Sequence, residues 1–271
     1  MSSLYFNEEL HPDAFAPGAR LPVWGADARH AAQVARVRTG ERIGVGDGAG
    51  RIGWGPVVHV AQGEVAIQAE EIVRAEPASP RLVLVQALAK GDRDELAIQA
   101  ATELGVSAVV PWQSARSVSV WKGDKVAKGV ERWRAVVREA SKQAIRPTIP
   151  EVGDLVTTRS LAASLRAADV EGRGSSSDEA AYRDLLALVL EPTAPETLVA
   201  TLRLAAHAQG AGRAPSTITL VVGPEGGIAS DELREFELAG AQLVRLGPEV
   251  LRTSTAGPAA ISALAVLLGR W

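Results

Sequence analysis

The second part of the chain, from about residue 80 onward, alternates short apolar runs with longer segments of mixed polarity. The apolar runs are typical of buried strands and occupy residues 82–88, 106–110, 185–190, 218–222 and 242–246. Apolar positions at helical spacing predict helices over residues 92–104, 125–141, 230–240 and 259–268. Strands that alternate with helices predict a mostly parallel sheet and an α/β fold.

The predicted helix over residues 125–141 also indicates which of its faces is buried. Its apolar residues recur at spacings of four and three positions: Val126, Val130, Trp133, Val137 and Ala140. This period places them on one stripe, so we expect the stripe to pack on the core, with Trp133 inside it. The other positions of this helix are largely basic.

Residues 1–75 have a different pattern, with many glycines between short β-branched runs such as 57–60 and 65–67. This pattern predicts a β-rich domain, interrupted by one helix over about residues 27–37. Residues 76–80, Glu-Pro-Ala-Ser-Pro, favour a short extended spacer. We therefore expect two domains, 1–75 and 76–271. The Gly- and Ser-rich residues 172–178 predict a flexible surface loop within the second.

Two of the predicted strands end in glycine loops. Residues 218–222 lead into Gly-Pro-Glu-Gly-Gly, and residues 242–246 lead into Gly247 and Pro248. Ser230 is the expected N-cap of the following helix, and Pro258 is expected in the first turn of the last one. Parallel sheets bind ligands beyond the carboxyl ends of their strands, where glycine permits close approach to the backbone. The glycines could serve only as tight turns, but two such loops together favour a binding site.

The composition excludes several kinds of site. The chain has no cysteine, which excludes disulfides and thiolate chemistry, and its four histidines lack ligand spacing, so we expect no metal. The glycine loops do not have the Gly-x-Gly-x-x-Gly or Gly-Lys-Ser/Thr patterns of phosphate cradles. The chain shows neither a signal-like N-terminus nor an apolar stretch of bilayer length, so we expect a cytoplasmic protein without membrane contact.

A basic segment stands out in a chain whose formal net charge is −3. Residues 116–146 contain nine lysines and arginines against three acidic residues. Such a run is either a solvated face or a surface that binds a polyanion such as RNA. Trp121 and Trp133 lie in the same segment and Trp112 just before it, and an exposed tryptophan there could stack on bases.

Several motifs resemble one known family. Gly-Pro-Glu-Gly-Gly at 223–227, with Leu-Gly-Pro-Glu-Val-Leu-Arg-Thr-Ser-Thr-Ala at 246–256, resembles the knotted SPOUT methyltransferases and, within them, the RsmE family. Val-Leu-Glu-Pro at 189–192 is similar to the first of the three cofactor loops of that family. Further similar segments cover nearly the whole chain and lie at residues 29–42, 46–48, 90–93, 102–106, 116–117, 139–143 and 146–147.

The resemblance implies a SPOUT trefoil-knotted α/β methyltransferase domain preceded by a small PUA-like β-barrel domain that binds RNA. It implies methylation of N3 of a specific uridine in 16S (small-subunit) ribosomal RNA, with S-adenosylmethionine as cofactor. The implied partners are ribosomal RNA in the small ribosomal subunit and a second copy of the chain in a homodimer. The apolar C-terminal helix over 259–268 agrees with burial at a subunit interface.

The resemblance also implies the residues of the site. The expected cofactor-binding residues are Leu190, Glu191, Pro192, Gly223, Pro224, Glu225, Gly226, Gly227, Leu246, Gly247, Leu251 and Arg252. The family-like motifs together with the basic segment give the expected RNA-binding residues, which are Arg29, Arg36, Arg38, Lys90, Arg93, Arg116, Arg132, Arg138 and Arg146.

The expected catalytic residues are Arg252 and Glu225. Uridine N3 must lose its proton before or during attack on the methyl group, and Glu225 is one of the carboxylates nearest to the loops in sequence. Glu225 could instead accept structural hydrogen bonds from loop amides. Arg252 could stabilise the developing oxyanion of the uridine or hold a phosphate.

The chain departs from the family pattern at two positions. Ala100 stands where the family usually has lysine, and Ser254 where it usually has glutamate. The first change weakens an RNA contact, and the second leaves open which group takes the proton. The alternatives are an RNA-binding protein of this fold without transfer activity, or a SPOUT enzyme with another RNA target.

Overall fold

The computed structural model describes residues 3–61, 63–171, 185–208 and 215–271, so the predicted loop over 172–178 lies outside the described residues. The chain divides into two compact units: Met1–Pro77 with Arg138–Ile149, and Ala78–Val137 with Pro150–Trp271. The division after Pro77 falls inside the predicted spacer. Nothing in the hydrophobic pattern indicated that residues 138–149 belong with the first unit.

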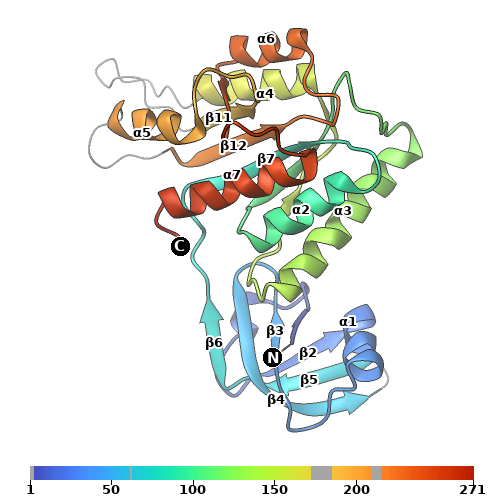
Figure 1. Ribbon diagram of the computed structural model, residues 1–271. Helices are drawn as coiled ribbons and strands as arrows, with labels where there is room; N and C mark the ends of the chain where they lie inside the picture. Colours follow the sequence, from blue (N-terminus) through green and yellow to red (C-terminus); the bar gives the residue numbers. More distant parts are fainter. Residues whose placement is uncertain (1–2, 62, 172–184, 209–214) are drawn as a thin grey trace. The chain divides into compact units, whose positions relative to one another are not determined.

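The first unit is built on a six-stranded sheet (Figure 1). Its strands are β1 (Leu4–Phe6), β2 (Arg20–Trp24), β3 (Arg42–Gly46), β4 (Arg51–Ala61), β5 (Glu64–Gln68) and β6 (Glu71–Arg74). They lie in the order β1-β3-β4-β5-β2, with β6 beside β4. Their pairing is antiparallel, apart from the parallel pair β1 and β3. The strands predicted at 57–60 and 65–67 are confirmed as parts of β4 and β5.

Helical turns complete the first unit. A 3-10 turn, η1 (Pro12–Ala14), precedes β2. The helix predicted over 27–37 is present as α1 (Gly25–Arg29), continued by one π-helical turn, η2 (His30–Val34). Ala28 and Ala31 of these turns share a core with Val23 of β2 and Val65 of β5.

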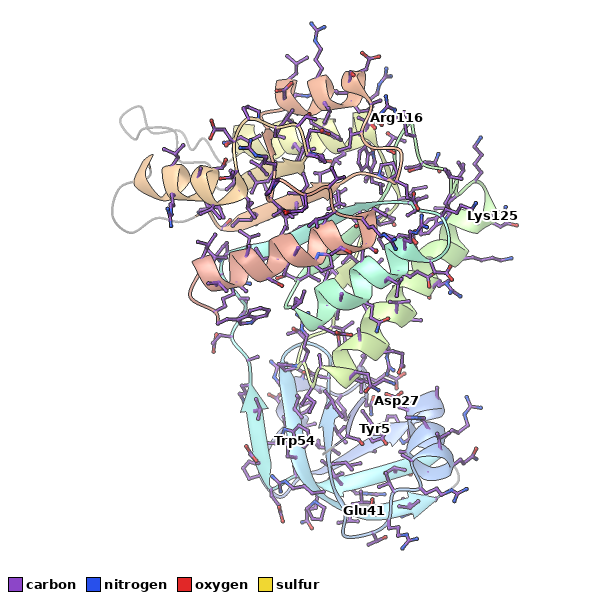
Figure 2. The ribbon with its side chains drawn as sticks, in the orientation of Figure 1. Tyr5, Asp27, Glu41, Trp54, Arg116 and Lys125 are labelled. Atoms are coloured by element: carbon purple, nitrogen blue, oxygen red, sulfur yellow. The ribbon has the colours of Figure 1, made fainter. Side chains whose placement is uncertain are left out.

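A buried ion cluster around Asp27 attaches the end of α3 (Asp124–Gln143) to this unit. Asp27, labelled in Figure 2, is 4% exposed and accepts hydrogen bonds from Arg138 at 3.0 Å, Lys142 at 2.9 Å and the Phe6 N–H at 2.9 Å. Arg138 also donates to Glu8 at 2.8 Å. Burial alone would raise the pKa of Asp27, but these hydrogen bonds outweigh burial and lower it.

Replacing Asp27 by asparagine should destabilise the protein by about 3 kcal/mol, because Arg138 and Lys142 then lack their buried counter-charge. Since the folded pKa is lowered, the stability from this carboxylate is present above the unfolded pKa of about 4 and is lost as pH falls through the folded pKa. Urea denaturation at about pH 7 and about pH 3 measures both effects. The exposed Asp13→Asn is the control, and a loss below about 1 kcal/mol at neutral pH would contradict the assignment.

The described residues of the second unit contain a seven-stranded sheet with parallel pairing, which confirms the predicted mostly parallel sheet, although its two short strands β9 and β10 were not predicted. Its strands are β7 (Arg81–Ala87), β8 (Ala108–Gln113), β9 (Glu151–Val152), β10 (Val156–Thr157), β11 (Leu185–Leu190), β12 (Thr217–Val222) and β13 (Gln242–Val244). Their order is β10-β8-β7-β12-β11-β13, with β9 beside β8. The glycine-ended strands β12 and β13 therefore lie on either side of β11, so the carboxyl ends of all three meet at one edge.

Helices cover both faces of this sheet (Figure 1). They are α2 (Arg93–Glu103), the start of α3, α4 (Thr158–Glu171), α5 (Leu198–Ala208), α6 (Ser230–Leu238) and α7 (Thr253–Leu267). Leu165 of α4 and Phe236 of α6 share a core with Val85 and Val221 of the sheet. On the opposite face Leu84 contacts Gly257 of α7, because successive strand residues point to opposite faces.

Two sequence expectations about helix ends are wrong. The last helix begins at Thr253, not near residue 259, so Pro258 lies inside it. Ser230 is the first residue of α6, and the N-cap is Ala229, whose N–H donates to the Glu232 carboxylate at 3.2 Å. Glu232 thus makes one half of a capping box, and Ala229 has no polar side chain to make the other half. The expected burial of Trp133 is confirmed at 1% exposure.

Candidate functional site

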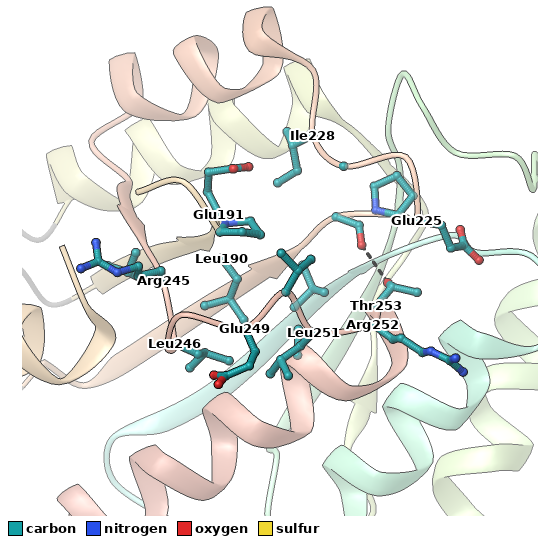
Figure 3. A pocket seen from close by; sticks show the side chains of 18 of the residues that line it. Leu190, Glu191, Glu225, Ile228, Arg245, Leu246, Glu249, Leu251, Arg252 and Thr253 are labelled. Atoms are coloured by element: carbon teal, nitrogen blue, oxygen red, sulfur yellow. Dashed lines mark hydrogen bonds between the residues drawn. The ribbon is translucent and has the colours of Figure 1, made fainter. Parts of the chain in front are cut away.

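A cavity of about 410 Å³ lies where β11, β12 and β13 end (Figure 3). Three segments of the second unit form its wall. Residues 190–192 follow β11, residues 222–228 follow β12, and residues 244–253 lead from β13 into α7. The glycine loops that follow the predicted strands therefore converge on one cavity, and the loop after β11 joins them.

The cavity has apolar walls and charged groups around them. Its apolar side chains come from the strand ends and loops: Leu190, Val222, Ile228, Val244, Leu246, Val250 and Leu251. Its charged side chains are three arginines and three glutamates: Arg93, Arg245, Arg252, Glu191, Glu225 and Glu249. In Figure 3 Glu225 and Arg252 lie on one side of the pocket and Arg245 on the other. With balanced charges and a largely apolar surface, the cavity suits a ligand with an aromatic part and no cluster of phosphates.

The structure places eleven of the twelve expected cofactor residues on this cavity, and Gly226 is the exception. Gly226 instead lies against Arg116, whose guanidinium donates to the Gly226 carbonyl at 3.1 Å. Whether the eleven hold a cofactor stays a prediction. Lining residues that the sequence did not indicate include Ile228, which follows the predicted loop, and Val244, which lies within the predicted strand.

Below the cavity a hydrogen-bonded chain ties three distant segments together. Thr253, the first residue of α7, donates through Oγ1 to the Gly223 carbonyl at 2.7 Å, as drawn in Figure 3. The same oxygen accepts from the side-chain amide of Gln86 at 2.8 Å. Gln86 is fully buried in β7. This chain fixes the loop after β12 to the start of α7 and directs the Thr253 hydroxyl proton to the Gly223 carbonyl.

Glu225 is held in place by two donors. Its Oε1 accepts from the Arg93 guanidinium at 2.7 Å and from the Lys90 N–H at 3.1 Å. Burial would raise the pKa of Glu225, but hydrogen bonds from backbone N–H groups and from Arg93 outweigh burial and lower it. A carboxylate with a lowered pKa is a weaker base. The contacts therefore agree with the structural alternative for Glu225.

Arg252 differs from the other arginines of the cavity. It is exposed, and among the described residues its guanidinium makes no hydrogen bond or ion pair. Arg245, in contrast, donates to the carbonyls of Ala194 and Pro195. Arg252 is thus free to act on a bound substrate.

The expected RNA-binding residues divide between the two units. Exposed members of the first unit are Arg29, Arg36 and Arg38, and exposed members of the second are Lys90, Arg93, Arg116 and Arg132. Arg138 is engaged in the Asp27 cluster. Arg146 is partly buried, which lowers its pKa to about 10. Arg138 and Arg146 are partly buried and therefore less suited to RNA contact than the seven exposed residues, of which Arg93, Arg116 and Arg132 also have protein partners.

Within residues 3–61, 63–171, 185–208 and 215–271, no group of three or more His, Cys, Asp or Glu side chains could hold a metal ion. In the same part of the chain, no helix has the length and apolar character needed to cross a membrane.

Comparison with known proteins identifies the family. A family model for an RNA methyltransferase domain matches residues 76–265. The ribosomal RNA small subunit methyltransferase E of Mycobacterium bovis is 41% identical over 271 residues, which cover all of this chain and 94% of the relative. The chain belongs to the ribosomal RNA small subunit methyltransferase E family.

Other members of this family agree over nearly the full chain. The Bacillus subtilis methyltransferase E is 28% identical over 257 residues, 94% of this chain and 93% of the relative. The crystal structure of the Neisseria gonorrhoeae methyltransferase E bound to S-adenosyl methionine has a TM-score of 0.76 at 27% identity and covers 98% of both chains. The fold, including its first unit, is thus similar to that of a solved methyltransferase E.

Proposed function

We propose that this protein transfers the methyl group of S-adenosylmethionine to N3 of a specific uridine in 16S (small-subunit) ribosomal RNA. The observation that carries the proposal is the convergence of the three loops on one cavity in a chain of the methyltransferase E family. The Neisseria relative, crystallised with S-adenosyl methionine, supports the choice of cofactor.

The residues present fit this cofactor. Leu190, Leu246 and Leu251 supply apolar surface for an adenine, and the loops after β12 and β13 supply backbone groups. The Glu249 carboxylate would accept hydrogen bonds from ribose hydroxyls. Bound there, the sulfonium group supplies an activated methyl, so the protein contributes mainly position and charge.

Arg252 is the group best suited to the chemistry of the uridine. Loss of the N3 proton places negative charge on the uracil carbonyl oxygens, and an unpaired guanidinium at the cavity would stabilise it. Glu225 would act indirectly, by holding the Arg93 side chain and the Lys90 backbone N–H in place through hydrogen bonds. The proton then passes to water or to a group of the substrate complex.

We further propose the finer features that the family resemblance implies. These are a trefoil knot at the three loops, a PUA-like first unit that binds RNA through Arg29, Arg36 and Arg38, and action in the cytoplasm. A homodimer is supported by exposed apolar residues at the end of the chain, namely Val266 at 60%, Leu267 at 41% and Trp271 at 65%. Light scattering should then give about twice the chain mass of 28.4 kDa.

Reversing the charge of Lys125 and Lys128 should weaken RNA binding. Both side chains are exposed at the start of α3, where Figure 2 labels Lys125, whereas Arg138 would break the Asp27 cluster if reversed. If both lysines contact phosphates, the slope of log affinity against log salt should fall by about 1 to 2 units. The double reversal of the exposed Arg159 and Arg166 on α4 is the control. Equal salt slopes in the two double variants would mean that the lysines are only solvated.

The function is tested directly on small ribosomal subunits isolated from cells that lack this enzyme. Incubation with S-adenosylmethionine carrying a labelled methyl group should add one methyl to one nucleotide. Nuclease digestion and mass spectrometry should place it on N3 of a uridine. A methyl on another nucleotide or atom would refute the stated target, and cofactor binding without transfer would refute the enzymatic role.

A further inference from the structure

The second unit has another cavity of about 400 Å³, beside the first. It lies between the turn that starts α2, the segment before α3 and the first half of α3. Its lining includes Lys90, Asp92, Glu95, Val118, Trp121 and Arg132. The turn at residues 90–93 separates the two cavities, because Lys90 and Asp92 line the second while Arg93 lines the first. The two cavities are therefore neighbours along the turn at residues 90–93.

The charges of this cavity are unsuited to a phosphate. Three carboxylates, Asp92, Asp94 and Glu95, face two cations, Lys90 and Arg132. Arg132 is already paired with Glu95. Asp94 is 5% exposed and accepts from the N–H groups of Ala89 at 3.4 Å and Glu95 at 3.0 Å. The surplus of negative charge disfavours phosphate, and no group of His, Cys, Asp or Glu side chains in the described part of the chain, this cluster included, could hold a metal ion.

Asp92 places a hydrogen-bond acceptor on the cavity, where it interacts electrostatically with Arg132. Its side chain is exposed and, within the described residues, makes no hydrogen bond or ion pair. Its φ of 57° is left-handed and follows Gly91 at 65°, so the turn carries the carboxylate on a constrained backbone. An ionised carboxylate only accepts, so it favours an amine and disfavours a carbonyl oxygen.

Trp121 gives the cavity an aromatic wall. Its indole lies against the backbone of Gly129, where a Cβ would be 2.6 Å from the ring. It also meets the buried Trp133 at 5.8 Å between ring centroids and 80° between planes. Trp112 and Trp133 are buried, whereas Trp121 is only partly buried and lines this cavity. An indole fixed in this way is a stacking platform for a base.

We propose that this second cavity holds the base of a nucleotide next to the target uridine, stacked on Trp121 and read through its exocyclic amine by Asp92. Adenine, cytosine and guanine have such an amine, and uracil does not. The cavity thus makes methylation depend on a flanking nucleotide. This inference rests on the proposed function for its target, but the stacking can be tested without methyl transfer.

The first experiment measures stacking alone. A short single-stranded RNA with a central uridine carries fluorescent 2-aminopurine, which has an exocyclic amine, on its 5′ or its 3′ side. Binding should quench the fluorescence of one of the two RNAs, and Trp121→Leu should remove at least about half of the quenching. Trp24→Leu, at an exposed tryptophan outside both cavities, is the control. Absent quenching, or equal quenching with Trp121→Leu, would overturn the proposal.

The second experiment tests the reading of the amine and does not depend on Trp121. Asparagine tolerates the left-handed backbone at position 92 and can donate as well as accept, so Asp92→Asn should fold but not discriminate. On small subunits with each flanking nucleotide changed in turn to the four bases, the wild type should lose roughly tenfold in kcat/KM with uridine at one position. The loss should shrink to less than about threefold in Asp92→Asn.

The control for this experiment is Asp124→Asn, an exposed acid outside the cavity, which should keep the wild-type preference. S-adenosylmethionine affinity should be equal in all three proteins. A preference that is unchanged in Asp92→Asn, or a wild type indifferent to both flanking positions, would sink the inference while leaving the methyl transfer itself intact. Absence of any methyl transfer in the wild type would instead refute the proposed function.

Discussion

Replacing Arg252 by alanine is expected to lower the kcat of methyl transfer by about 10²-fold to 10³-fold, with S-adenosylmethionine affinity changed by less than about threefold. A decrease in kcat of this size is expected when an enzyme loses one charged hydrogen-bond donor that stabilises a developing oxyanion. Arg252 caps the start of α7, lines the cavity and has no partner among the described residues, so its removal leaves no buried group unpaired. The folded structure should therefore persist.

Steady-state kinetics on small ribosomal subunits separates two roles that Arg252 could have. A guanidinium that acts on the transition state changes kcat, whereas one that only holds a phosphate raises the KM for the subunit. Arg234→Ala, at an exposed arginine of α6 outside the cavity, is the control and should change neither. A KM effect alone would assign Arg252 to RNA binding, and no effect on either constant would remove it from the mechanism.

The strands and loops of the site were predictable because buried parallel strands are continuous apolar runs that end abruptly. The run at 185–190 coincides with β11 (Leu185–Leu190). The run at 218–222 lies in β12, and its glycine loop lines the cavity. The local hydrophobic pattern is sufficient to locate these strands, because each one is buried between other apolar strands whatever the order of strands in the sheet.

The start of α7 was not predictable from local pattern. Residues 253–258, Thr-Ser-Thr-Ala-Gly-Pro, have poor helix propensity, yet they are helical. The helix is tied by Thr253 to the Gly223 carbonyl and to Gln86, which is 167 residues away in sequence. Tertiary hydrogen bonds between distant segments override propensity, and no sequence window contains them.

For a similar reason, the count of charged residues along the sequence did not show which side chains are free to bind a ligand. The basic segment 116–146 counts Arg138 as a surface cation, but its partner Asp27 lies 111 residues away and neutralises it. Glu225 likewise pairs with Arg93 across 132 residues. A count along the chain cannot show which charges are matched in space, so Arg138 looked available for RNA and Glu225 looked available as a base.

The second large effect is expected at Gly227, where valine should weaken S-adenosylmethionine binding by about a hundredfold. Gly227 has a φ of 71°, and its N–H closes a tight turn on the Pro224 carbonyl at 2.9 Å. A β-branched residue is strained in this conformation, at a cost of about 1–3 kcal/mol or displacement of the loop. Because the turn lies on the cavity wall, its displacement would remove backbone groups from the ligand.

At Gly227, backbone strain can be distinguished from steric overlap of an added side chain with its neighbours. A Cβ at Gly227 would meet only the Arg116 guanidinium, at 3.9 Å, so the structure gives no steric reason for the loss. Gly223 is the opposite case, since its φ is not left-handed but a Cβ there would lie 2.6 Å from the Ile228 side chain.

Gly227→Asn is therefore the informative partner of Gly227→Val, because asparagine tolerates positive φ. Calorimetry with S-adenosylmethionine should find the asparagine variant within about tenfold of the wild type and the valine variant far weaker, with both still folded by circular dichroism. If asparagine and valine were equally damaging, a side chain at this position would be filling the cofactor site rather than straining the turn. Wild-type affinity in the valine variant would mean that the loop does not contact the cofactor.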